Sequence, residues 1–143
     1  MQNDTLASIN ASELRIGNIV NSFTINITEV KNIHESGINY ENKFDEDLCT
    51  DYEVLIPFDH LGGIPLTPEI LEKCGFDIVF SEGDEVCYQL NGISIIHRHP
   101  DYQLCDQDAY LGSVSRIGVP FRHLHQLQNL FYCLVGEELK IEL

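Results

Sequence analysis

The stretch EVCYQLNGISIIHR, residues 85–98, indicates the fold most directly. Two apolar runs, Glu85 to Leu90 and Ile93 to Arg98, flank the dipeptide Asn91-Gly92. Both central residues of a type I′ turn have positive φ, which asparagine and glycine tolerate better than other residues. The segment therefore predicts a β-hairpin of two antiparallel strands joined by a two-residue turn.

A short helix is expected upstream of this hairpin. Thr67 suits the N-cap, Pro68 suits the first helical position, and Gly75 suits the position just beyond the helix end. The next residues, Phe76 to Phe80, have the character of a strand that leads into the hairpin.

The first 60 residues predict a meander of short antiparallel strands. Glu13 to Val20 alternates like a strand with a turn or bulge at Gly17, and the runs 23–30, 33–40 and 52–58 also have strand character. Residues 1–10 are polar and unpatterned, which predicts a flexible arm ahead of a single domain over residues 11–143.

The C-terminal part predicts a second helix, from Phe121 to Val135, with Gly136 at its end. The expected buried face consists of Leu124, Leu127, Phe131 and Leu134, and the expected polar face of His125, Gln128, Asn129 and Tyr132.

We further expect a strand at 109–111, a loop at 112–118 and a closing strand at 139–143. The predicted fold class is α+β: a small barrel-like or meandering antiparallel sheet, a hairpin-containing sheet and two helices.

Charge restricts the classes of partner. The chain has 8 Lys and Arg against 23 Asp and Glu, a formal net charge of −15. Such a chain repels nucleic acid and anionic membranes, so we expect neither as a direct partner. The excess of acidic residues either makes the surface soluble or imitates the phosphate backbone of a nucleic acid. The carboxylates from Glu35 to Asp59 would form such an imitation.

The cysteines and the N-terminus predict a cytoplasmic protein. The five cysteines are scattered without a C-x-x-C pair, which is typical of reduced, mostly buried thiols. The first residues lack the pattern of a signal peptide, and no window approaches the ~20 apolar residues that span a bilayer.

Three segments carry a family resemblance. They are ELRIGN (13–18), IPLTPEILEKCGF (64–76) and HQLQNLF with GEEL (125–131 and 136–139). In these segments the chain resembles a widespread group of small, mostly uncharacterised proteins encoded by phages, prophages and Bacteroidota-type genomes. The resemblance covers about a quarter of the chain and brings no catalytic residue. It implies a mobile-element accessory protein, for which partner binding and counter-defence are common roles. Residues 82–118 lie outside it, so a function carried there is not implied by the resemblance.

Basic residues gather where acidic residues are missing. The segment from Ala109 to Gly136 holds no Asp or Glu, and His97-Arg98-His99 lies shortly before it. A pocket built there would suit a small phosphate-bearing anion, because arginine offers a planar fork of donors. The candidate ligand-binding residues are His97, Arg98, His99, Arg116, Arg122 and His125. The alternative is that the arginines only pair with surplus carboxylates.

Catalytic signatures are weak in this sequence. His97 and His99 have the i, i+2 spacing of many metal ligands, with a third ligand available from His123, His125, Cys105 or Asp101. No nucleophile elbow, phosphate loop or dinucleotide motif accompanies them. We therefore expect no catalytic residues, no resident metal and no cofactor.

The leading hypothesis is a non-enzymatic phage-type accessory protein that sequesters a small phosphate-bearing, nucleotide-type signal molecule or a host protein. The alternatives are an acidic nucleic-acid mimic that inhibits a host DNA-binding protein, and a metal-dependent hydrolase. A homo-oligomer that completes its pocket across a symmetric interface is compatible with the first hypothesis.

Overall fold

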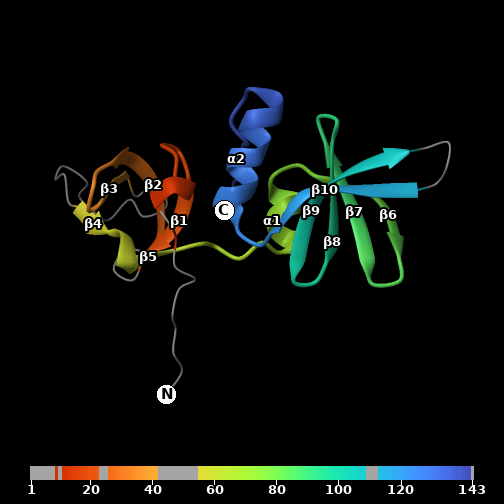
Figure 1. Ribbon diagram of the computed structural model, residues 1–143, viewed down its shortest axis with the longest axis horizontal. Helices are drawn as coiled ribbons and strands as arrows, with labels where there is room; N and C mark the ends of the chain where they lie inside the picture. The colour runs from red at the N-terminus through yellow and green to blue at the C-terminus, as the bar shows by residue number, and fades with distance from the viewer. Residues whose placement is uncertain (1–8, 10, 23–25, 42–54, 109–112, 143) are drawn as a thin grey trace, which may run out of the picture. The chain divides into compact units, whose positions relative to one another are not determined.

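A computed structural model describes residues 9, 11–22, 26–41, 55–108 and 113–142 (Figure 1). Contacts divide the chain into two compact units: Met1–Pro65 with His123–Asn129, and Leu66–Arg122 with Leu130–Leu143. Helix α2, Leu124–Val135, therefore begins in the first unit and ends in the second. The single domain expected over residues 11–143 stays a prediction.

The first unit contains a five-stranded antiparallel sheet in the order β4-β3-β2-β1-β5. Its elements are the 3-10 turn η1 (Ala11–Glu13), β1 (Ile19–Ser22), β2 (Asn26–Ile33), β3 (Gly37–Glu41), β4 (Leu55–Pro57), the 3-10 turn η2 (Phe58–His60) and β5 (Leu61–Gly62). Val20, Val30 and Ile38 are fully buried in its core. Ile9, which falls in the predicted flexible arm, is buried in the same core, while the other residues of 1–10 lie outside the described residues.

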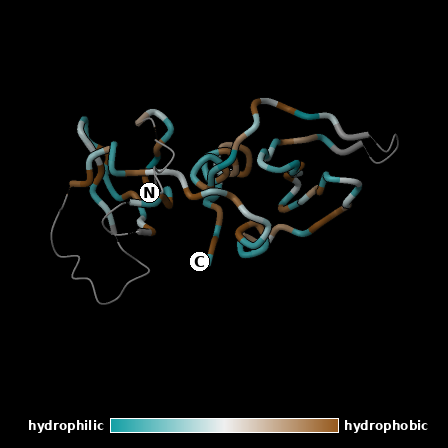
Figure 2. The backbone as a smooth tube through the Cα atoms, turned by 90° about the horizontal axis from the view of Figure 1, so that it is seen from below, coloured by the Kyte–Doolittle hydropathy of each residue, from teal (hydrophilic) through white to brown (hydrophobic). Residues whose placement is uncertain are grey.

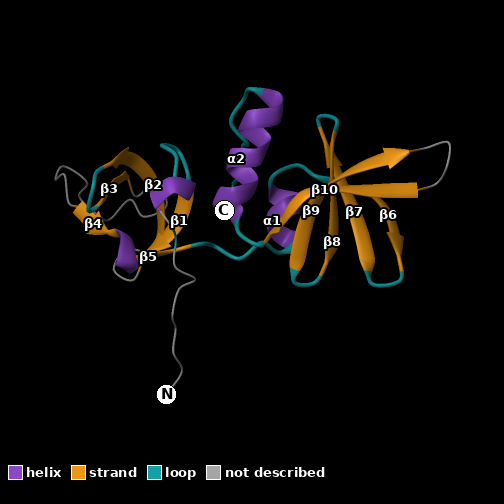
Figure 3. Ribbon diagram, in the orientation of Figure 1, coloured by secondary structure: helices purple, strands orange, loops and turns teal. Residues whose placement is uncertain are grey.

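The second unit contains helix α1 (Pro68–Lys73) and a five-stranded meander in the order β10-β9-β8-β7-β6 (Figure 3). Its strands are β6 (Asp77–Glu82), β7 (Glu85–Leu90), β8 (Ile93–Arg98), β9 (Asp101–Asp108) and β10 (Ser113–Phe121). Side chains alternate between the two faces of a strand. One face buries Tyr88, Ile95 and Tyr102, and the other buries Cys87, Ile96 and Cys105. The first four residues of β8, from Ile93 to Ile96, are all buried. Figure 2 shows hydrophobic segments, in brown, alternating with hydrophilic segments, in teal, along the backbone.

The predicted α+β fold class is confirmed: the described residues form two antiparallel sheets and two α-helices. Strands β7 and β8 have the predicted bounds, and their turn has the positive φ angles of a type I′ turn, 51° at Asn91 and 81° at Gly92. The hydroxyl oxygen of Thr67 accepts a hydrogen bond from the backbone N–H of Ile70 at 3.2 Å, as an N-cap does.

Two predicted strands are wrong or shortened. The stretch Glu13 to Val20 is mostly a turn, because Gly17 has a φ of 96° and the Asn18 side-chain oxygen accepts from the backbone N–H of Arg15. Only Ile19 and Val20 of that stretch belong to β1. The closing strand predicted at 139–143 is absent from the described residues, where 139–142 have no regular structure.

The region between Pro100 and Phe121 also differs from the prediction. Residues 113–118, expected as a loop, belong to β10, which pairs with β9 and has a register shift between Ile117 and Phe121. The bulge explains the error, because Gly118 and Pro120 imitate a loop composition inside a strand. The strand predicted at 109–111 lies outside the described residues.

Helix α2 is confirmed but buries different side chains than predicted. Leu134, expected in the core, is 53% exposed, whereas His125 and Gln128, expected on the polar face, are buried. Gln128 hydrogen-bonds to backbone groups of the first unit, which offsets the cost of its burial, whereas the His125 ring stacks on His123. No helix among the described residues is both long enough and apolar enough to cross a membrane.

Candidate functional site

The first unit contains a buried polar network that joins two of the family-like segments. The Asn129 side-chain oxygen accepts from Asn18 Nδ2 at 2.8 Å and from Arg15 Nε at 3.2 Å, and its amide nitrogen donates to the Glu13 carbonyl at 2.7 Å. Gln128 accepts from the backbone N–H of Ile19 at 2.7 Å and donates to the Gly17 carbonyl at 3.2 Å. These side chains bind the protein's own backbone, so the network holds the fold together.

The remaining family-like segment, IPLTPEILEKCGF (64–76), also has a structural role. In the first unit, the Leu124 N–H donates to the Ile64 carbonyl at 2.9 Å. In the second unit, the Leu66 N–H donates to the Arg122 carbonyl at 2.8 Å, and Thr67 caps helix α1. These hydrogen bonds give several residues in each of the three regions a structural role.

His125 lies in the first unit and is only 1% exposed. Neither ring nitrogen has a hydrogen-bond partner among the described residues, and the ring stacks on His123 with centroids 5.9 Å apart. Burial lowers the pKa of His125 to about 4; the Glu13 carboxylate opposes this and His123 reinforces it. His125 is therefore neutral near pH 7.

The second unit contains a polar pocket of about 410 Å³ beside the β8–β9 turn. It is lined by Arg98, His99, Asp101, Gln103, Arg116 and Pro120. These residues come from the end of β8, the turn, and the paired strands β9 and β10. The pocket thus brings together three of the six predicted ligand-binding residues.

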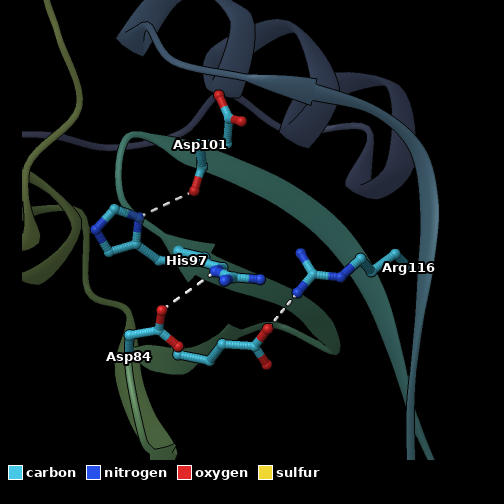
Figure 4. Close-up of polar contacts among 6 residues, drawn as sticks. Asp84, His97, Asp101 and Arg116 are labelled. Carbon is cyan, nitrogen blue, oxygen red and sulfur yellow. Dashed lines mark hydrogen bonds and ion pairs between the residues drawn. The ribbon is translucent and has the colours of Figure 1, made fainter.

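Each arginine near this pocket is paired with a carboxylate. Figure 4 shows the ion pairs that Asp84 and Arg116 make. Arg98 Nε lies 3.2 Å from Asp84, Arg122 Nε lies 2.6 Å from Asp101, and Arg116 Nη2 contacts Glu85. All three guanidinium groups are substantially exposed, so each pair contributes about 0–1 kcal/mol to stability.

The ion pairs leave donors unused. Within the described part of the chain, Arg98 engages only Nε and Arg116 only Nη2. Two further nitrogens of each guanidinium are therefore available to an anion, while the carboxylates limit the motion of the side chains.

The ion pair of Arg116 lies across one face of the second unit's sheet. Its partner Glu85 is on β7, so the ion pair spans the two strands between them, β8 and β9. On this face Cys87, Ile96 and Cys105 form a buried cluster with Phe80 packed against it. The strands curl enough for Arg116 and Glu85 to meet on the same face as this cluster.

The remaining predicted residues do not line the pocket. His97 is on the opposite face of the sheet, stacked on Tyr102 with centroids 3.9 Å apart, and its Nδ1 lies 3.0 Å from the Asp101 carbonyl oxygen (Figure 4). Arg122 reaches the pocket only through its ion pair with Asp101. His125 belongs to the first unit.

Sequence reasoning missed Gln103, Asp101 and Pro120 as pocket residues. Gln103 donates from Nε2 to the Gly118 carbonyl at 2.7 Å, which fixes the bulge of β10 beside the pocket. The alternation of Gln103 with buried Tyr102 and Cys105 was the available signal, once 101–108 is recognised as a strand.

The described residues contain no cluster of three His, Cys, Asp or Glu side chains placed to hold a metal ion. Cys74, Cys87 and Cys105 are free and buried, and burial raises the pKa of Cys74 and of Cys105 to about 12. Such thiols are neutral and poorly nucleophilic. Cys133 is free and exposed.

Comparison of the chain with models of protein families, with curated proteins and with solved structures finds no match. The resemblance to phage and prophage proteins stays a prediction.

Proposed function

We propose that this protein is a non-enzymatic binding protein that captures a small phosphate-bearing, nucleotide-type ligand in the pocket beside the β8–β9 turn. The observation that carries the proposal is the pocket itself, which presents Arg98, Arg116, His99 and the Gln103 side chain around a volume of about 410 Å³. Guanidinium groups match phosphate oxygens in geometry as well as in charge.

Charge supports a small ligand over a polymer. The chain has a net charge of −15, so a long polyanion would be repelled by the rest of the surface. A compact anion needs only the local donors, and local ion pairs already orient Arg98 and Arg116.

The division between scaffold and pocket supports a role in a mobile element. The family-like segments are occupied by the backbone contacts described above, while the pocket is built from residues 98–120, outside those segments. We infer that a phage-type scaffold carries a separate binding site, and that capture of a host signal nucleotide serves counter-defence.

The proposal is tested by isothermal titration calorimetry with a panel of inorganic phosphate, mononucleotides and cyclic dinucleotides. We expect saturable binding of at least one nucleotide, and a loss of affinity of about tenfold or more in Arg98→Gln and in Arg116→Gln. Lys31→Gln is the matched control, because it removes an equal charge from an ion pair with Glu29 in the first unit.

Binding that is unchanged in both arginine variants would refute the pocket. A panel without any saturable ligand would refute nucleotide capture.

A further inference from the structure

Strand β6 forms an edge of the second unit's sheet that the nucleotide pocket does not use. In the sheet order β6 has β7 as its only neighbour. Five of its six residues are exposed, among them Ile78 (64%) and Val79 (43%). An exposed edge strand presents backbone N–H and C=O groups to which another extended chain can pair.

A groove of about 280 Å³ lies beside this edge, between β6 and helix α1. Its lining residues are Pro68, Glu72, Phe76, Asp77, Ile78 and Tyr88. Ile78 lies directly opposite Tyr88 of β7, so both side chains are on one face of the sheet. Phe76 and Tyr88 are buried, whereas Ile78 is exposed. The groove thus joins a buried aromatic wall to an open strand edge.

The groove and its edge carry unpaired negative charge. Glu72 and Asp77 line the groove, and Glu82 ends β6. Among the described residues none of these three carboxylates has an ion-pair partner. A further carboxylate lies nearby: burial raises the pKa of Tyr88, and the Glu69 carboxylate raises it further.

Basic residues of the same unit do not neutralise this surface. Lys73, the one basic residue of α1, is not in the groove lining. The neighbouring strand β7 contains no Lys or Arg, and its Glu85 lies directly opposite Glu82. Arg98 and Arg116 are engaged by Asp84 and Glu85. A basic segment is therefore attracted to the β6 edge, and an acidic segment is repelled.

Lysine and arginine side chains fit the groove in shape as well as in charge. Their apolar stems can lie along apolar surface while the charged head stays beside a carboxylate and water. In this groove the stem would contact Ile78 and the aromatic wall of Phe76 and Tyr88, and the head would face Glu72. An aromatic ring adds a further attraction for a cation that lies over its face.

We propose that the groove between α1 and β6 binds an extended, lysine- or arginine-rich segment of a partner protein. The segment runs along the β6 edge and places a basic side chain beside Glu72. The register shift of β6 between Ile78 and Phe80 limits backbone pairing to short stretches, so the side-chain contacts in the groove carry the specificity. This inference does not rest on nucleotide capture.

The test is fluorescence anisotropy with a labelled peptide of about eight residues that alternates lysine and threonine. Its counterpart of glutamate and threonine is the control peptide. The titration is made at about 0.15 M salt, where distant charges are largely screened. We expect saturable binding of the basic peptide only.

Two pairs of variants separate the groove from the overall negative charge. Glu72→Gln should weaken binding by about threefold or more, whereas Glu137→Gln, at an exposed glutamate of the same unit, should leave it unchanged. Ile78→Ser should also weaken binding by about threefold or more, whereas Val119→Ser, at an exposed valine of the other edge strand, should not. Equal losses within either pair would overturn the proposal, because the peptide would then not distinguish the groove from the rest of the surface.

Hydrogen exchange then locates the bound peptide. Backbone amides of β6 should gain protection, and those of β10 should not. Absence of saturable binding, equal binding of the acidic peptide, or protection at β10 instead of β6 would overturn the proposal. A dimer in sedimentation whose β6 amides are already protected without peptide would also overturn it, because a second copy would then occupy the edge.

Discussion

Replacement of His125 by leucine tests the buried histidine of α2. The imidazole is 1% exposed, and its pKa is lowered from 6.5 to about 4 by burial. The folded state therefore binds the proton less tightly than the unfolded chain does. The stability linked to the neutral form of His125 is fully present above about pH 6.5, and it is lost as the pH falls towards the folded pKa of about 4.

The size of the effect follows from the same shift. Each pKa unit corresponds to about 1.4 kcal/mol, so the difference between 6.5 and about 4 amounts to about 3 kcal/mol of unfolding free energy. His125→Leu should remove this contribution to the pH dependence. At neutral pH the variant should be as stable as the parent or more stable, because both ring nitrogens lack a hydrogen-bond partner among the described residues.

Urea unfolding at a series of pH values between about 7.5 and about 4 measures this difference. The gap between variant and parent should widen in favour of His125→Leu by about 3 kcal/mol as the pH falls. Leu124→Val, at a fully buried residue of the same unit that does not titrate, should change the stability by an amount that stays constant across the range. A gap that stays constant with pH would refute the reasoning.

Three further predictions concern the scaffold. Asn129→Ala should lower the unfolding free energy by about 1–3 kcal/mol in urea unfolding, because it deprives Asn18 and the Glu13 carbonyl of a buried partner; an unchanged midpoint would contradict the network. Gly92→Ala should cost about 1 kcal/mol or more in the same assay, because the residue has a φ of 81°; a more stable variant would argue against the type I′ turn. Iodoacetamide should modify Cys133 in the native protein and should modify the buried cysteines only after unfolding; peptide mass spectrometry would contradict this if it found early modification of any of Cys74, Cys87 and Cys105.

Local chemistry explains which elements could be predicted from the sequence. The β7–β8 hairpin and the start of α1 depend on residues close together in the chain: Asn91-Gly92 for the turn, Thr67 and Pro68 for the cap. β10 depends instead on pairing with β9, and its Gly118 and Pro120 disguise a bulged strand as a loop. No local sequence pattern indicates the pairing of β10 with β9.

The candidate site, too, could be predicted only in part from local sequence patterns. The predicted basic region includes Arg98, His99 and Arg116, which the β8–β9 turn and the β9–β10 pairing bring to one pocket. The same reasoning placed His97 with them, although the pleat of β8 turns its side chain to the other face. Gln128 and Asn129 were expected at the surface because their backbone partners, within residues 13–19, lie more than 100 positions away in the chain.

The most direct test of nucleotide capture is an NMR titration that follows the arginine Nε–H signals of the ¹⁵N-labelled protein during addition of each nucleotide in the panel. Capture predicts saturable shifts of Arg98 and Arg116 with one common dissociation constant, while Arg15, whose Nε is bound to Asn129, stays in place. Signals of Arg98 and Arg116 that do not move with any nucleotide would contradict the account.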